Sequence, residues 1–107
     1  MRRATAVSAL VWLLIAAFTS GEVRADPARG LALAERWCSE CHGVRPNDAS
    51  SAPKIPTFPQ IAAEPSATNM SLRVFLRTPH PSMPNLVLKP DDVDDIVDYI
   101  LSLKPAR

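Results

Sequence analysis

The sequence predicts an all-α domain, and three features of its pattern support this fold class. The run 28–37 is rich in Ala and Leu, which favour helices. A second run, 93–101, carries apolar residues at the three- and four-residue spacing of a helix. No stretch alternates apolar and polar residues in the way a half-buried strand does. We therefore expect helices joined by loops and no sheet.

The N-terminal segment 1–25 has the layout of an export signal. Two arginines precede a largely apolar run of 15 residues, 4–18. A membrane span needs about 20 such residues, so the run predicts a secretory signal peptide rather than a spanning helix. The sequence Val23-Arg24-Ala25 places the expected cleavage after Ala25. An uncleaved segment that tethers the protein to a membrane stays open as the alternative.

The expected mature domain, 26–107, is a single small unit with almost no net charge. The whole chain has 12 Lys and Arg residues and 11 Asp and Glu residues. Cleavage would remove three arginines and one glutamate, which leaves 9 basic and 10 acidic residues. This balance lacks the basic excess of nucleic-acid-binding proteins, so we expect no nucleic-acid partner. A domain of this size buries a limited core and often needs a covalent staple.

The first helix of the mature domain is expected over 28–37. Asp26 can cap it, and Pro27 suits the first helical position, where no backbone hydrogen bond is lost. Gly in the middle of a helix costs about 1 kcal/mol relative to Ala. Gly30 therefore predicts that another helix approaches closely at this point. Trp37 is expected to pack in the core.

An irregular loop is expected over 43–60, because this segment contains four prolines and several small polar residues. A long loop in a small domain is usually functional or disordered. Three apolar side chains near its end are candidates to pack on a bound group: Ile55, Phe58 and Ile61. A short helix is expected over 61–64.

The second half of the chain predicts two more helices. Thr68, Asn69 and Ser71 offer caps before a helix over 72–78. The last helix is expected from Pro90 to about residue 104, with aspartates in the first turn, where the macrodipole favours anions. We expect the acidic face of this helix to be a solvated surface: Asp91, Asp94, Asp95 and Asp98.

The stretch Cys38-Ser39-Glu40-Cys41-His42 is a C-x-x-C-H pattern, which is typical of covalent attachment of c-type haem. Two thiols three positions apart can form thioethers with the two vinyl groups of one porphyrin. The adjacent His42 is then placed to ligate the iron. The sequence predicts one covalently attached haem c, with Cys38 and Cys41 as attachment sites and His42 as an axial ligand.

Other interpretations of the two cysteines are less well supported. A thioredoxin-like redox pair belongs at the helix start of a βαβ unit, for which the chain has no strand pattern. A zinc site of two Cys and two His would need His80, which stands 38 positions beyond His42.

Taken together, the helices and the C-x-x-C-H pattern make the chain resemble the monohaem class I c-type cytochromes, over almost all of 26–104. The residues that carry the resemblance are Gly30, Cys38, Cys41, His42, Pro53, Met83 and Tyr99. The resemblance implies a cytochrome c fold, with three main helices and loops wrapped around the haem. It implies that the first and last helices cross closely, with Gly30 and Ala34 against Ile96, Tyr99 and Ile100. It also implies that a proline carbonyl accepts the N–H of the ligating imidazole, and Pro53 best matches that proline. The chain departs from many members in having no Trp or Tyr between Gly43 and Asp98 to bond a haem propionate.

Three residues are candidates for the second axial ligand: Met70, His80 and Met83. Met83 precedes Pro84 on a stiff, extended segment, and the resemblance places the ligand in such a Met-Pro loop. Met70 lies near a helix start and is expected in the core as a gap filler. His80 stays a rival, since haems with two histidine ligands exist. We expect His42 and Met83 as the axial ligands.

With both axial positions filled, the protein needs no catalytic residues, and no triad or acid–base pair is evident. The expected function is electron transfer in the periplasm, with redox proteins as partners: a dehydrogenase, an oxidase or a reductase. One alternative is the cytochrome subunit of a periplasmic dehydrogenase complex. Another is a gas-binding or peroxidase-like haem protein with five-coordinate iron. Basic residues near the haem predict a basic docking side: Arg45, Lys54, Arg73, Arg77 and Lys89.

Overall fold

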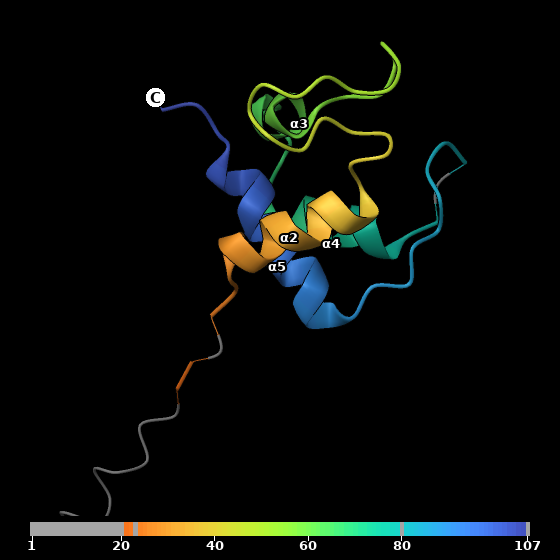
Figure 1. Ribbon diagram of the computed structural model, residues 1–107. Helices are drawn as coiled ribbons and strands as arrows, with labels where there is room; N and C mark the ends of the chain where they lie inside the picture. The colour runs from red at the N-terminus through yellow and green to blue at the C-terminus, as the bar shows by residue number, and fades with distance from the viewer. Residues whose placement is uncertain (1–20, 23, 80, 107) are drawn as a thin grey trace, which may run out of the picture.

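The computed structural model describes residues 21–22, 24–79 and 81–106, and this part of the chain contains four helices and no β-strand. The helices are α2 (Pro27–Trp37), α3 (Phe58–Ala63), α4 (Asn69–Arg77) and α5 (Pro90–Ser102). Figure 1 shows α2 crossing α5, with α4 alongside them and α3 set further up. The predicted all-α fold class is confirmed. Among the described residues, no helix is both long enough and apolar enough to cross a membrane.

The first and last helices begin where the sequence predicted. Asp26 Oδ1 accepts a hydrogen bond of 2.9 Å from the backbone N–H of Ala28, and Pro27 occupies the first turn of α2. Pro90 opens α5 in the same way, with two aspartates in the first turn. The last helix ends at Ser102, two residues before the predicted end, and its last turn is closed by the bond from Leu103 N–H to the carbonyl of Ile100.

The two middle helices begin earlier than predicted, because each starts at a capping box. Thr57 and Gln60 exchange backbone-to-side-chain bonds of 2.8 and 3.3 Å, which starts α3 at Phe58 instead of residue 61. Thr68 and Ser71 do the same for α4, which starts at Asn69 instead of residue 72. Such reciprocal bonds satisfy N–H groups that a helix start leaves free.

Helix α5 is the centre of the core, and the other three helices pack against it. Its side chains Val93, Ile96 and Val97 have no exposed surface. The buried ring of Phe58, from α3, lies 6.3 Å from that of Tyr99. Arg73 of α4 pairs with Asp94 of α5 at 3.1 Å. One amphipathic helix thus supplies the surface on which the rest of the domain assembles.

The crossing of α2 and α5 is close, as Gly30 predicted. A Cβ atom on Gly30 would overlap the backbone carbonyl of Asp95 and lie 2.9 Å from Cβ of Tyr99. Asp95 itself is 6% exposed, so the prediction that it belongs to a solvated acidic face is wrong. Its carboxylate is instead paired with Arg29 of α2. The tight crossing brings this position of α5 under α2.

Candidate functional site

The C-x-x-C-H segment forms one turn at the end of α2. Cys38 ends the helix through a bond of 2.8 Å from its N–H to the carbonyl of Ala34. The carbonyl of Cys38 then accepts the N–H groups of Cys41 at 3.2 Å and of His42 at 2.9 Å. This turn gathers two free thiols and an imidazole on one short piece of backbone.

The thiol of Cys38 does not have the environment of a redox-active cysteine. Cys38 is 7% exposed, and burial raises the pKa of its thiol to about 11. Redox-active cysteines have a lowered pKa, because only the thiolate is a nucleophile. Among residues 21–22, 24–79 and 81–106, no group of three or more His, Cys, Asp or Glu side chains is arranged to hold a metal ion. His80, which a zinc site would need, lies outside the described residues.

The ring of His42 is held from the other side of the loop. Its Nδ1 lies 2.6 Å from the carbonyl oxygen of Pro56. A carbonyl oxygen only accepts, so Nδ1 carries the proton and Nε2 is the nitrogen with a free lone pair. The ring of Phe58 lies 5.7 Å from the imidazole and is tilted by 53° to it. This tautomer and this orientation are those that an iron-ligating histidine needs.

The prediction that Pro53 is this acceptor is wrong, because Pro56 has the position. Two long-range backbone bonds set the path of the loop: Ser51 N–H to the carbonyl of Cys41 at 2.9 Å, and Phe58 N–H to the carbonyl of Gly43 at 2.8 Å. The second bond draws the chain just before Phe58 against His42. Pro53 lies on the exposed bend between the two bonds. The sequence did contain a pointer to Pro56, since the Thr57 capping box fixes a helix start directly after it.

Gly43 allows the loop to fold back immediately after His42. A Cβ atom there would lie 2.5 Å from the carbonyl oxygen of Asp48. Its N–H donates to Ser50 Oγ at 3.1 Å, and the N–H of Arg45 donates to Asp48 Oδ2 at 2.9 Å. The next residue, Val44, is fully buried and its carbonyl accepts the hydroxyl of Tyr99 at 2.7 Å. The loop is therefore anchored to α5 just after the candidate iron ligand.

A pocket of about 610 Å³ opens between this loop, α3 and α4. Its apolar lining includes Pro56, Ile61, Leu72 and Phe75, and its polar lining includes Lys54, Gln60, Glu64, Ser66 and Ser71. None of the four predicted haem-holding residues lines it. Pro56 connects the pocket with the C-x-x-C-H segment, because it lines the pocket and its carbonyl accepts a hydrogen bond from His42. The prediction that Ile61 packs on a bound group fits this lining.

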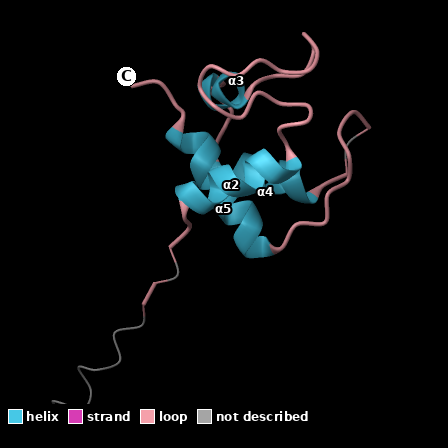
Figure 2. Cartoon of the chain, viewed as in Figure 1, coloured by secondary structure: helices cyan, strands magenta, loops and turns pink. Residues whose placement is uncertain are grey.

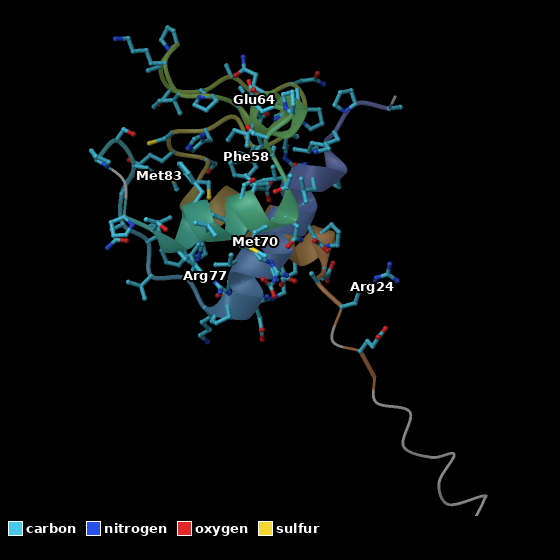
Figure 3. All side chains as sticks on the ribbon, turned by 180° about the vertical axis from the view of Figure 1, so that it is seen from behind. Arg24, Phe58, Glu64, Met70, Arg77 and Met83 are labelled. Atoms are coloured by element: carbon cyan, nitrogen blue, oxygen red, sulfur yellow. The ribbon has the colours of Figure 1, made fainter. Side chains whose placement is uncertain are left out.

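Met83 lies on the loop between α4 and α5 and is half-buried. Figure 3 shows it on the side of the molecule away from Arg24, and Figure 2 shows the long loops that separate the helices. No described hydrogen bond or ring contact involves Met83, so its role as a ligand stays a prediction.

Met70 is 72% exposed, so the prediction that it packs in the core is wrong. The same holds for Trp37, which is 48% exposed.

The fold and the site together define a c-type cytochrome domain. The family described as "Cytochrome C oxidase, cbb3-type, subunit III" matches residues 25–100, and the chain belongs to this family of cytochrome c domains. The chain is also similar to cytochrome c-552 of Bradyrhizobium diazoefficiens, with 38% identity over 93 residues that cover 87% of this chain and 89% of that protein. No solved structure matches the chain. Membership of the family implies covalently bound haem c and a part in electron transport.

The described residues fit a haem c group by their chemistry. Two unpaired thiols three positions apart are free to form thioethers. The Nε2 lone pair of His42 is free because Nδ1 is bonded to Pro56. An open pocket with a largely apolar lining adjoins the same loop.

Proposed function

We propose that this chain is a periplasmic electron-transfer protein with one haem c, held by Cys38 and Cys41 and ligated by His42 and Met83. The hydrogen bond of 2.6 Å from His42 Nδ1 to the Pro56 carbonyl carries the proposal. That bond fixes the tautomer that leaves the lone pair of Nε2 free for iron, as in metal-ligating histidines.

The bound haem would supply a one-electron couple between ferric and ferrous iron. The chain's residues hold that couple in place and tune it. The Pro56 carbonyl orients the imidazole of His42 and raises its basicity, as partners of metal-ligating histidines do. The Met83 thioether would favour ferrous iron and so raise the reduction potential relative to a second histidine. With His42 and Met83 both bound to the iron, no position would remain open for a substrate.

The proposed location is the periplasm, reached through a signal peptide, 1–25, that is cut after Ala25. Redox proteins are the proposed partners: a dehydrogenase, a reductase or an oxidase. The oxidase is supported by the description of the family to which the chain belongs.

A second candidate is a cytochrome subunit in a lasting complex with a periplasmic dehydrogenase. Met70 and Val74 favour it, because they lie one turn apart on α4 and are 72% and 56% exposed. Apolar surface of this kind often marks an interface. Purification of the haem-loaded protein from periplasm tests this: a stable partner in equal amount supports the complex, and a monomer supports the free carrier.

Substitution of Met83 tests the axial ligands. Met83→Ala should abolish the weak near-infrared band between sulfur and ferric iron, lower the reduction potential and let carbon monoxide bind the ferrous form. Met70→Ala is the matched control, because Met70 is exposed on α4 and should change none of these.

Two other outcomes would contradict this ligand set. If His80→Ala produces these changes and Met83→Ala does not, the ligand is His80. High-spin ferric spectra in the unchanged protein would favour the five-coordinate alternative.

A further inference from the structure

The start of α2 is bonded to a buried carboxylate that the proposed electron transfer does not use. The backbone N–H of Asp26 donates to Oδ1 of Asp95 at 2.7 Å, across 69 positions of the chain. Asp95 is 6% exposed, and its other oxygen, Oδ2, accepts from Arg29. Backbone N–H groups at a helix start are usually bonded to caps or water, so a distant buried carboxylate is an unusual partner.

The charges around this bond are unbalanced. Three carboxylates belong to this junction: that of Asp95 accepts the Asp26 N–H, that of Asp92 shares Arg29 with Asp95, and that of Asp26 caps α2. Arg29 is the one cation among their described contacts, and it pairs with both Asp92 and Asp95. A buried carboxylate is costly unless it is paired and hydrogen-bonded. A carboxylate accepts about four hydrogen bonds, and the described contacts of Asp95 fill two of these positions.

We propose that Asp95 is the receptor for the N-terminal amino group that forms when the chain is cut between Ala25 and Asp26. The cut adds water across the peptide bond. The C–N bond breaks, Ala25 leaves with a carboxylate, and the nitrogen of Asp26 becomes an ammonium group. The nitrogen that already lies 2.7 Å from Asp95 thereby gains a positive charge and two more N–H donors. The proposal rests on the proposed processing after Ala25 and is independent of the haem ligands.

The position of the cut agrees with the surroundings of these residues. Arg24 is exposed and Ala25 half-buried. Figures 1 and 3 show the described residues before α2, 21–22 and 24–26, leading away from the helices. Removal of that segment breaks no described contact of the domain, while the first residue that stays, Asp26, both caps α2 and bonds Asp95.

The new charge strengthens the junction of α2 and α5. A hydrogen bond between two charged groups is about twice as strong as a neutral one. The dipole of α2 opposes a cation at its N-terminus, so the carboxylates of Asp26 and Asp95 must offset that cost. Processing therefore closes an ion pair that holds the two terminal helices together, and the mature domain is more stable than a chain that keeps its leader.

Two haem-loaded proteins that differ by one residue test the proposal. One begins at Asp26, and the other keeps Ala25, which moves the amino group about 3.8 Å along the chain and leaves an amide at Asp26. At neutral pH, the form that begins at Asp26 should have a folding equilibrium constant about tenfold larger in denaturant titrations. Asp95→Asn in both forms should remove this difference. Asp98→Asn, on the same helix and without a described ion pair, should preserve it.

The pH dependence separates a charge effect from the effect of chain length. The charged groups around the amino group are Asp26, which caps α2, Arg29 from α2, and Asp92 and Asp95 from α5. An unpaired α-amino group has a pKa of about 8, and Asp95 raises it in the folded protein. The advantage of the form that begins at Asp26 should be complete below about pH 8 and disappear as the pH rises through the raised pKa.

The two parts of the proposal, the ion pair and the cleavage site, can be contradicted by separate results. Equal stability of the two forms, or a difference that persists at alkaline pH, overturns the ion pair, and this comparison needs no Asp95 variant to fold. Mass spectrometry of the exported protein that finds a terminus other than Asp26 overturns the processing instead. Neither result bears on haem ligation, which Met83→Ala tests separately.

Discussion

The two sides of this domain are held together in different ways. At the α2–α5 junction, formed around Gly30, Asp95 and Tyr99, the two backbones are in close contact, and the exposed Arg29 pairs with the buried carboxylate of Asp95. The loop side, which carries the candidate haem site, consists of the loops 38–57 and 78–89 and depends on a few long-range hydrogen bonds next to an open pocket. Steric fit between the two helices determines the structure of the first region. In the second region, a few individual hydrogen bonds fix the path of the chain. Substitutions should therefore affect stability at the junction and haem properties on the loop side.

Loss of the cysteines should have the largest effect on the loop side. Replacement of both Cys38 and Cys41 by Ala should give a chain without covalent haem. Acid–acetone extraction of the unchanged protein should leave a coloured polypeptide, and the double variant should yield a colourless one. Cys41→Ser alone should leave at most one thioether and lower the yield of loaded protein. If the unchanged protein loses its colour on extraction, the assignment of haem c is wrong.

A methyl group at the α2–α5 junction should have the next largest effect. Gly30→Ala places a Cβ atom against the backbone carbonyl of Asp95, which cannot move aside as a flexible side chain would. Overpacking typically costs about 1–3 kcal/mol, which thermal unfolding would show as a lower Tm. Ala32→Leu, at an exposed position of α2, is the control and should leave Tm nearly unchanged. A Gly30→Ala protein with the normal Tm would mean that the helices are further apart.

Tyr99 connects the two regions, so its substitution tests how separate they are. Tyr99→Phe removes the buried bond of 2.7 Å to the Val44 carbonyl. An acceptor left unpaired in this way costs about 1–3 kcal/mol, measurable by denaturant titration. A change in the haem spectrum as well would show that the junction also positions the loop after His42.

The pH dependence of stability gives a second test of the environment of the Tyr99 hydroxyl. Burial raises the pKa of its hydroxyl above the ordinary value of 10.0. A raised pKa in the folded state means that the stability is complete below about pH 10 and falls as the pH rises above it. Tyr99→Phe should lack this part of the alkaline loss. An identical alkaline profile in the two proteins would show that Tyr99 ionises as easily folded as unfolded.

The smallest effects should come from surface charges on the loop side. Two of the five basic residues predicted to dock a partner are already paired, Arg45 with Glu35 and Arg73 with Asp94. The exposed Lys54, Arg77 and Lys89 have no described ion pair and remain as docking candidates. Electron-transfer rates with a native partner should fall as ionic strength rises, and Lys89→Ala should weaken that dependence. Rates independent of salt would contradict a basic docking side.

Local patterns account for what the sequence determined by itself. Helical periodicity and proline placement identified the terminal helices, and C-x-x-C-H predicted the attachment turn, because these patterns depend on residues within one or two turns of each other. Gly30 indicated the close crossing because only glycine fits there. The capping boxes at Thr57 and Thr68 were also local, and they would have corrected the starts of α3 and α4.

Tertiary structure decided where distant residues meet. The Thr57 capping box marks Pro56 only as the residue before a helix start, and it is the long-range bond from Phe58 N–H to the Gly43 carbonyl that brings the carbonyl of Pro56, and not that of Pro53, to His42. Asp95 had the spacing of a solvated face, yet the crossing of α2 buried it against Arg29. Met70 is apolar but stays exposed, since no described helix covers that face of α4. The periodicity of a helix determines on which face each side chain lies. Whether that side chain is buried depends on which other element the rest of the chain packs against that face.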